Sequence, residues 1–244
     1  MNPTTDGQMG ATDGSNGVRT SVFLQPIAAP LVLGYFAGGC GFLLFGVWLV
    51  GDLGAMTAAA LGTMPFLFMF AGIAQLAAGL WSVRARDPSH TSLFTAWGGF
   101  WIGYTLLWFA SGLGTYVLPA FAGGFAPLGM VMVLMAGITW STAFAALARS
   151  PLQFLSQVGA AIATSLAAVA LFAGPSGLLD AAAWIFVATS ALYYYNGLAS
   201  MINALYGRVV FPYFTWRREE NVLGAHPFEP IQFPESEPGV KVGE

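Results

Sequence analysis

The sequence predicts an all-α membrane protein with six transmembrane helices and both termini in the cytoplasm. Of the 244 residues, 57% are hydrophobic and only 8% carry a charge, whereas about 25% of a typical soluble domain is charged. A soluble protein of this length needs a charged surface, so the composition indicates a multi-pass protein of the cell membrane. The apolar residues form six long runs, and all the basic residues lie outside them.

The chain before the first apolar run is rich in Gly, Thr, Ser and Asn. It lacks the basic start followed by an apolar stretch that marks a cleavable signal peptide. We therefore expect residues 1–26 to form a disordered cytoplasmic tail.

Six apolar runs are long enough to be membrane spans, because crossing a hydrocarbon core of about 30 Å takes roughly 20 apolar residues. Charges and turn-forming residues separate the runs, and no Asp, Glu, Lys or Arg falls inside them. The predicted spans are 28–50, 59–81, 92–113, 124–147, 152–173 and 181–205. They form one transmembrane domain, residues 27–212.

The segment after the last span, residues 213–244, is polar and rich in proline. It has too few apolar residues to build a core, so we expect a polar cytoplasmic tail.

The basic residues support six spans, because this count places all of them on one side of the membrane. The other side receives only Asp52 and Asp180. Since basic loops face the cytoplasm, both termini are predicted to be cytoplasmic. The basic residues are Arg19, Arg84, Arg86, Arg149, Arg208, Arg217, Arg218 and Lys241.

A tripeptide that occurs twice suggests an inverted three-plus-three repeat. The Ala-Pro-Leu that opens the first span, Ala29 to Leu31, recurs at the fourth span, Ala126 to Leu128. Three helices later the chain crosses the membrane in the opposite direction, as such a repeat requires.

Metal, cofactor and enzyme chemistry have no support in the sequence. The single cysteine, Cys40, leaves no disulfide and no Cys-based metal site. His90 and His226 lie far apart with no cluster of carboxylates beside them, so we interpret both as uninvolved in function. Neither a nucleotide-binding loop nor a catalytic constellation is present, and no nucleic-acid partner is predicted.

Uncharged polar residues are concentrated on single faces of several spans. Since polar groups facing lipid cost several kcal/mol each, we expect these faces to point inward. Two interpretations stay open: hydrogen bonding between helices, or a solute path lined with donors and acceptors. The residues are Gly72, Gln75, Gly79 and Ser82 in the second span, Thr139, Ser141 and Thr142 in the fourth, Gln153, Gln157 and Thr164 in the fifth, and Tyr193, Asn196, Ser200 and Asn203 in the sixth.

The third span carries two stripes. Its aromatic stripe, Phe94, Trp97, Trp101, Tyr104 and Trp108, faces lipid, a neighbouring subunit or a hydrophobic constriction, and spacing alone favours plain packing. Its small-residue stripe has the four-residue spacing that lets helix backbones approach closely, and the first span has a similar stripe beside Phe36. These predicted packing residues are Thr95, Gly99 and Gly103 in the third span, with Gly34 and Gly38 in the first.

Several motifs resemble one transporter family. "FAGIAQLAAGLW" (70–81) followed by "SLFTAWGGFW" (92–101), and "YYNGLA" (194–199) in the sixth span, resemble the acetate uptake transporters of the GPR1/FUN34/YaaH class, the succinate–acetate permeases. Two stretches depart from the family pattern. The first-span signature Asn-Pro-Ala-Pro-Leu-Gly-Leu is Ile27 to Leu33 here, and the loop sequence Asn-Thr-Phe-Gly is Asp87-Pro88-Ser89-His90.

The resemblance implies a homo-hexamer with one pore in each protomer. It also implies a hydrophobic constriction formed by Phe36, Trp97 and approximately Gly159. On this basis we expect proton-linked uptake of acetate and other short carboxylates such as succinate, with protons and lipid as further partners and no cofactor. Gln75 and Asn196 are the expected hydrogen-bond donors to the carboxylate.

The sequence also fits two alternatives to carboxylate transport. Six-helix channels for a neutral solute such as urea, a short amide or ammonia also lack buried charge. A non-transporting membrane sensor or assembly subunit is the third interpretation, with the polar C-terminal tail as its binding segment.

Overall fold

The computed structural model describes residues 29–50, 58–115, 125–174 and 176–214. All of them belong to one compact unit, Ile27–His226, and every regular element in these ranges is a helix. The predicted tails, 1–26 and most of 213–244, lie outside the described residues, as do the predicted first residues of the first and fourth spans.

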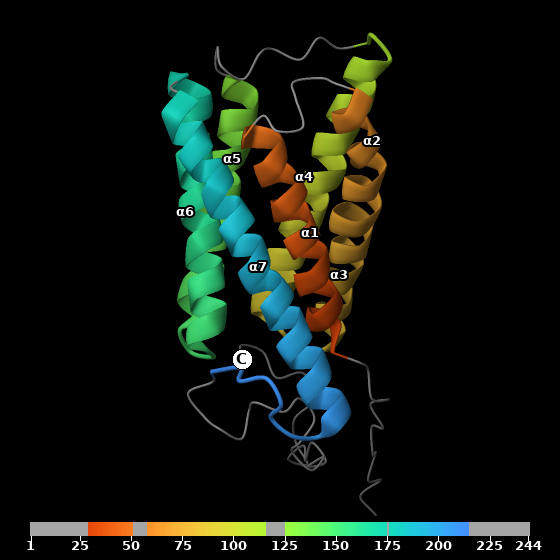
Figure 1. The fold of residues 1–244 in the computed structure, drawn as a ribbon, viewed down its shortest axis with the longest axis vertical. Coiled ribbons are helices and arrows are strands. Elements are labelled where there is room, and N and C mark those ends of the chain that lie inside the picture. Colours follow the sequence, from red (N-terminus) through yellow and green to blue (C-terminus); the bar gives the residue numbers. More distant parts are fainter. Residues whose placement is uncertain (1–28, 51–57, 116–124, 175, 215–244) are drawn as a thin grey trace, which may run out of the picture. The chain divides into compact units, whose positions relative to one another are not determined.

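The helices follow the predicted spans to within a few residues (Figure 1). The second span is built from three consecutive segments, of which the middle one is a π-helix. The elements are α1 (Pro30–Val50), α2 (Ala58–Phe66), η1 (Leu67–Ala74), α3 (Gln75–Arg84), α4 (Pro88–Gly112), α5 (Ala126–Ala146), α6 (Pro151–Ala173) and α7 (Ser176–Tyr206).

Five of the helices in the described ranges are long and apolar enough to cross a membrane: Pro30–Val50, Gly62–Arg84, Ala126–Ala146, Pro151–Ala173 and Gly177–Tyr206. The remaining long helix, α4, has 25 residues, which is enough to span at 1.5 Å per residue. Its tryptophans, tyrosine and glycines contribute little hydropathy, however. The all-helical membrane fold is confirmed, while the count of six spans and the cytoplasmic termini stay predictions.

Local sequence sets where two of the helices begin. Asp87 caps α4 by accepting a hydrogen bond from the backbone N–H of His90, and Pro88 occupies the first turn. Ser150 caps α6 in the same way, ahead of Pro151. A short polar side chain followed by proline is a strong start signal, because proline has no N–H that would be left unpaired. The cap explains why α4 begins four residues before the predicted span.

The second span changes its geometry after Pro65, which lies inside α2. Proline removes a backbone donor and crowds the preceding turn, and the chain continues as the π-helix Leu67–Ala74. Wide turns of this kind are frequent at functional sites. Gln75 follows the π-helix directly and is fully buried.

Neighbouring helices pack in chain order, and α1 and α7 close the bundle by packing along each other (Figure 1). Consecutive spans pack on each other among the first three spans and again among the last three. An inverted three-plus-three repeat needs this arrangement, but the repeat itself stays a prediction. The chain enters at the start of α1 and leaves after α7 at the same end of the bundle. The basic residues of the described ranges lie at the helix termini of this end, which we name the basic end: Arg84, Arg86, Arg149 and Arg208.

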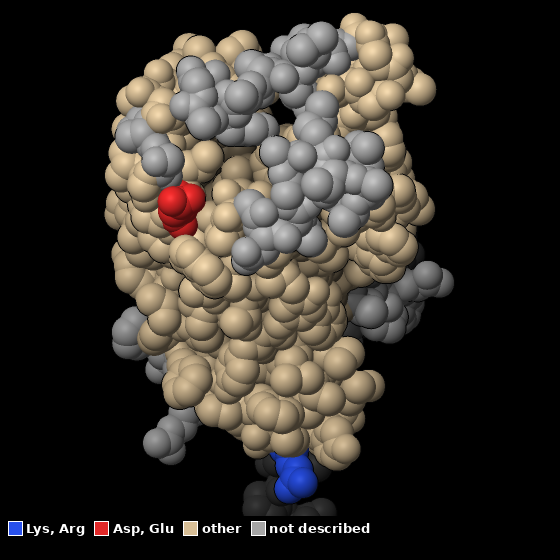
Figure 2. All heavy atoms as spheres, turned by 45° about the horizontal axis from the view of Figure 1, so that its top comes forward, with Lys and Arg blue, Asp and Glu red and all other residues tan. Residues whose placement is uncertain are grey.

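Large hydrophobic side chains are exposed along the helices between the two ends, Leu106, Leu134 and Val169 among them. On the face drawn in Figure 2, basic atoms lie at one end, acidic atoms lie toward the other, and the middle carries neither. This distribution fits a bilayer-facing belt.

The interior is filled with aromatic rings. The whole aromatic stripe of α4 is buried, and Trp97 and Trp101 have no exposed surface. Trp97 and Trp101 therefore face the inside of the protomer, and the alternatives of lipid and a neighbouring subunit are wrong for these two residues.

Candidate solute pathway

The polar faces predicted from helical spacing are buried. Gln75 and Asn196 have no exposed surface, and Gln157 is 2% exposed. Ser141 is the exception. It lies exposed on α5, where its hydroxyl donates to the carbonyl of Gly137 in its own helix. Most of these residues thus lie where they can hold helices together or line a path.

Gln75 presents an amide N–H2 group that has no hydrogen-bond partner among the described residues. Its Oε1 accepts the indole N–H of Trp101 at 3.1 Å. Because an indole N–H can only donate, the amide oxygen must face Trp101 and the nitrogen must point away from it. Nε2 points toward Gly38, where an added Cβ would lie 2.7 Å from it. A buried donor without an acceptor is costly, so this position suits a ligand that brings an acceptor.

Tyr193 lies beside this amide. Its ring would be 3.0 Å from a Cβ on Gly38, and its hydroxyl donates to Oε1 of Gln157 at 3.0 Å. The ring also packs edge-on against Tyr35, with centroids 5.3 Å apart. Gln75, Tyr193 and Gln157 therefore form a polar patch across α3, α7 and α6.

Asn196 has a spare acceptor rather than a spare donor. Its Nδ2 donates to Ser156 Oγ at 3.3 Å and to the carbonyl of Leu192 at 2.9 Å. Its Oδ1 is buried and has no hydrogen-bond partner among the described residues. The geometry thus favours a solute that donates a hydrogen bond to Asn196, unlike the donor role expected from sequence.

Trp97 lies at the centre of an aromatic layer made of Phe42, Trp97, Trp101 and Phe186. Its ring meets Phe42 edge-on, with centroids 4.8 Å apart, and its indole N–H donates to Oγ1 of Thr139 at 3.1 Å. The hydrogen bond fixes the indole, and the neighbouring rings fill the space around it. This layer is a hydrophobic barrier beside the polar patch.

The structure does not bring the three expected constriction residues together. Phe36 packs on α7, against the ring of Tyr194 at 6.0 Å and beside Gly197. Gly159 lies against α7 as well, where a Cβ would be 2.5 Å from Oγ1 of Thr189. The first-span aromatics that point into the interior include Tyr35, one position before Phe36 and 1% exposed, and Phe42, which meets Trp97.

Three of the predicted packing residues have close neighbours. A Cβ on Gly34 would overlap the ring of Phe94, Gly38 borders Gln75, and a Cβ on Gly79 would lie 2.6 Å from the backbone N of Thr95. At Gly34 and Gly79, α1 and α3 can approach α4 closely because a side chain is missing, whereas Gly38 faces α3 and α7.

Gly99 and Gly103 behave differently, since a Cβ at either would meet nothing within 4 Å. The glycine of α4 that packs within the protomer is Gly98, where a Cβ would lie 2.5 Å from the backbone N of Leu76. Because successive residues on a helix are about 100° apart, the neighbouring glycine turns away from α3.

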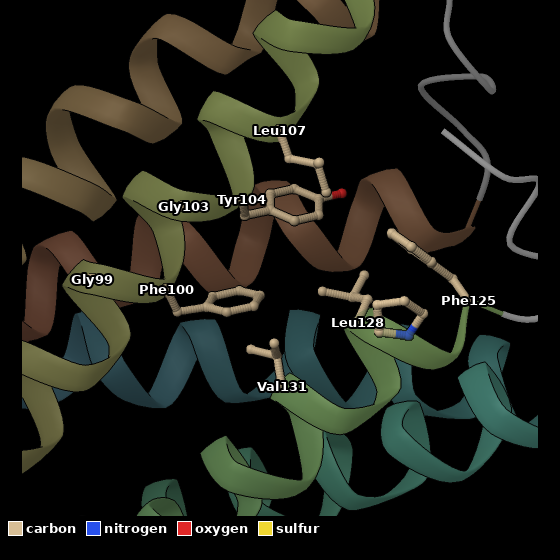
Figure 3. A pocket seen from close by; sticks show the side chains of 9 residues that line it. Gly99, Phe100, Gly103, Tyr104, Leu107, Phe125, Leu128 and Val131 are labelled. Carbon is tan, nitrogen blue, oxygen red and sulfur yellow. The ribbon is translucent and has the colours of Figure 1, made fainter. Parts of the chain in front are cut away.

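Gly99 and Gly103 line an open apolar groove of about 420 Å³ between α4 and the first turns of α5 (Figure 3). Phe100 and Tyr104 project into it from α4, and Leu128 and Val131 face them from α5. Phe100 also contacts Trp101 of the aromatic layer, with centroids 4.8 Å apart. The groove and the polar patch are therefore separated by aromatic rings.

A cluster of charged residues lies at the basic end. Arg149 binds the Asp87 carboxylate through both nitrogens, Nη1 to Oδ2 at 2.8 Å and Nη2 to Oδ1 at 2.9 Å. His90 Nδ1 lies 2.6 Å from the same Oδ2. Burial raises the pKa of Asp87, but the hydrogen bond from His90, together with the positive charges of His90 and Arg149, outweighs it and holds that pKa well below its usual range.

His90 reaches from this cluster into the interior. Its ring is 2% exposed, and its Nε2 lies 3.0 Å from the hydroxyl of Tyr35. The structure therefore places the Asp87 carboxylate and Tyr35 beside His90, while the interpretation of His90 as uninvolved in function stays untested. The missed signal is the spacing Asp-Pro-x-His, which places a helix cap and a histidine one turn apart on the same side. Arg149 lies 62 residues away from Asp87 in sequence, and its pairing has no local signal.

Two comparisons with known proteins give matches, one to a solved structure and one to a family profile. A structure described as that of the bacterial acetate channel SatP superposes with a TM-score of 0.69 at 24% sequence identity, covering 77% of this chain and 99% of that one. At this identity the likeness shows the fold. A comparison with curated proteins gives no match. The profile of the GPR1/FUN34/yaaH family matches residues 15–215, and the chain therefore belongs to that family.

Proposed function

We propose that the protein carries acetate and other short carboxylates, such as succinate, across the cell membrane, with its basic end in the cytoplasm. Family membership and the fold shared with an acetate channel support this assignment. The observation that carries it is the amide of Gln75. Trp101 holds its oxygen, and its N–H2 is left as a buried donor facing Gly38.

An uncharged donor suits transport better than a charged one. A carboxylate bound by Lys or Arg inside the membrane would form a strong pair and leave slowly. An amide offers a weaker hydrogen bond, and conduction requires binding that is favourable enough to enter and weak enough to leave. The protomer interior follows this rule, because the described charged residues are at the ends of the bundle.

The aromatic layer favours the protonated acid. A carboxylate crossing between Phe42, Trp97 and Phe186 would lose its water without gaining a counter-charge, which is expensive in an apolar medium. The neutral acid avoids this cost. Its O–H also suits the free acceptor on Asn196. We therefore expect uptake to rise as external pH falls, and flux unchanged between about pH 5 and 8 would contradict this step.

A neutral amide is the second candidate solute. The free Oδ1 of Asn196 accepts an N–H of urea or a short amide as readily as the O–H of an acid. Competition separates the two: excess urea should leave uptake of labelled acetate unchanged if the carboxylate assignment is right, whereas excess succinate should reduce it.

The open glycines of α4 support assembly with further copies of the chain. Gly99 and Gly103 have the spacing of a close helix contact, and within the described ranges an added Cβ at either would meet nothing within 4 Å. We include a homo-hexamer in the proposal, with the α4–α5 groove as part of the subunit contact.

The central experiment is uptake of labelled acetate into proteoliposomes with and without an inward proton gradient. Gln75→Ala is the test variant and Ser141→Ala the control, since Ser141 bonds its own helix on the outer surface. The proposal expects proton-dependent uptake that Gln75→Ala strongly weakens and Ser141→Ala retains. No flux in the unmodified protein under any gradient would overturn it.

A further inference from the structure

The proposed solute path does not include the cluster of Asp87, His90 and Arg149. Two of its members, Asp87 and His90, belong to the stretch in which this chain departs from the family pattern. We propose that His90 is the proton-binding residue of transport and that a proton on His90 and a carboxylate beside Tyr35 stabilise each other. The inference rests on the proposed function and adds to it a defined site for the coupled proton.

The hydrogen positions around Asp87 follow from its partners. The carboxylate receives two N–H groups of Arg149 and the backbone N–H of His90, and the low pKa of Asp87 keeps it ionised. An ionised carboxylate only accepts. His90 Nδ1, 2.6 Å from Oδ2, must therefore carry a hydrogen. Arg149 Nη1 lies 3.3 Å from Nδ1 because both donate to the same oxygen.

With Nδ1 protonated, the state of Nε2 decides the direction of the bond to Tyr35. In neutral His90, Nε2 carries a lone pair and accepts a hydrogen bond from the Tyr35 hydroxyl, 3.0 Å away. When His90 takes a second proton, Nε2–H becomes the donor and the tyrosine oxygen the acceptor. The tyrosine hydrogen then needs another acceptor.

Within the described residues the Tyr35 hydroxyl has one hydrogen-bond partner, His90 Nε2, and the tyrosine ring is packed among other rings. Phe94 and Tyr193 meet it edge-on, with centroids 5.4 and 5.3 Å away. A protonated His90 thus produces a buried hydroxyl donor without a partner, which is costly. A carboxylate oxygen arriving beside Tyr35 removes this cost by accepting the bond.

Charge balance leads to the same result. The groups that face His90 are Asp87 before α4, Arg149 between α5 and α6, and Tyr35 on α1, with Tyr193 and Tyr213 beyond Tyr35. Asp87 and Arg149 compensate each other, so a proton on His90 adds one unpaired positive charge. One carboxylate neutralises it. Such coupling is reciprocal, because each ligand raises the affinity for the other by the same factor.

The site continues the path from Gln75. Tyr193 borders Gly38 together with Gln75 Nε2, and its other side packs on Tyr35. An acid passing Gln75 reaches Tyr35, where its O–H bond breaks and an N–H bond forms at Nε2 of His90. The carboxylate remains beside the tyrosine hydroxyl. The N–H bond at Nε2 then breaks as the proton passes to water at the basic end, and the carboxylate leaves to solvent at the same end.

The test uses difluoroacetate, whose strong acid form is absent near neutral pH, so only an anion can bind. Its affinity for the detergent-solubilised protein is measured by calorimetry at pH 6 and pH 8, and proton uptake on binding is followed with an indicator dye. Because a proton on His90 and the bound anion stabilise each other, the unmodified protein should bind roughly tenfold more tightly at pH 6 than at pH 8 and take up protons on binding. His90→Gln should bind equally at both pH values without proton uptake.

His226→Gln is the matched control, since it removes the other histidine of the chain, and it should keep the pH dependence. Tyr35→Phe retains the ring and should also lose the coupling, which decides the matter if His90→Gln does not fold. Proton uptake that persists in either variant, or binding of acetate without binding of difluoroacetate, would overturn the inference. If neither acid binds the unmodified protein at any pH, the proposed function fails instead.

Discussion

Trp101 donates its indole N–H to Oε1 of Gln75 across the contact between α4 and α3, at 3.1 Å. An amide can rotate by 180° and exchange its oxygen and nitrogen, and this bond removes the choice. The tryptophan therefore acts as a positioning residue, which keeps the N–H2 of Gln75 directed at Gly38 and Tyr193.

Trp101→Phe should raise the KM for acetate by roughly tenfold, since about 1–1.5 kcal/mol of hydrogen-bond energy no longer selects one orientation of the amide. The maximal rate should change less, because the donor itself remains. Initial rates of labelled acetate uptake in proteoliposomes measure both. Trp140→Phe is the control, because the indole N–H of Trp140 bonds Ser165 away from Gln75. Equal KM values for the two variants would remove Trp101 from this role.

Gly38→Ala should weaken acetate uptake while leaving the protein folded. The new Cβ would lie 2.7 Å from Nε2 of Gln75, so the flexible amide must turn away from the position in which its N–H2 donates to the solute. Losing a hydrogen bond to a charged group costs about 1.5–3 kcal/mol, which corresponds to a roughly tenfold to hundredfold lower affinity. Gly137→Ala, in open space on α5, is the control, and normal uptake by Gly38→Ala would contradict the site.

Trp97→Ala should admit longer carboxylates. The ring fills the aromatic layer against Phe42 and Phe186, and each methylene excluded from an apolar site is worth about 1–3 kcal/mol. The ratio of butyrate to acetate uptake should therefore rise by roughly tenfold or more. Because removing a buried tryptophan costs about 3–5 kcal/mol of stability, Trp97→Phe serves as a milder second variant. An unchanged ratio in both would assign Trp97 to packing alone.

The membrane fold and its polar faces could be predicted because both depend on patterns within one helix. Length and hydropathy indicate a span, and a spacing of three or four residues places Gln75 and Gln157 on buried faces. The π-helix before Gln75 has no such signature, since its wide turns arise from backbone hydrogen bonding after Pro65.

The site was predicted less completely because its contacts join distant spans. Trp101 and Gln75 are 26 residues apart, and Asp87 and Arg149 are 62 apart. Sequence periodicity cannot specify such pairs. It also cannot distinguish Gly98, which packs on Leu76, from the adjacent Gly99, which faces the open groove.

Acid should destabilise the protein through Asp87. A carboxyl whose pKa is lowered on folding stabilises the folded state above its unfolded value of about 3.9, and this stabilisation is lost as pH falls toward the folded value. Burial opposes the lowered pKa of Asp87, and the hydrogen bond from His90 and the charges of His90 and Arg149 produce it. The Tm of the solubilised protein, followed by tryptophan fluorescence, should therefore fall between about pH 5 and pH 3.

Asp87→Asn should have a lower Tm than the unmodified protein at pH 7 and a smaller decrease toward pH 3. Asp180→Asn is the control for losing an acidic residue away from Arg149. A Tm difference between Asp87→Asn and the unmodified protein that stays the same from pH 7 to pH 3 would mean that the carboxylate charge contributes nothing.

Leucine at Gly99 and Gly103 should disrupt the proposed hexamer without unfolding the protomer. Within the chain a side chain at either position meets open space, whereas Gly98→Leu would drive into the backbone of Leu76. Close helix contacts between subunits tolerate only small residues, so the double variant should elute as smaller assemblies, with the mass measured by light scattering in detergent. Gly137→Leu also enters open space and should keep the native mass. If the double variant kept it too, the α4–α5 groove would face lipid, and the subunit contact would lie on another face of the bundle.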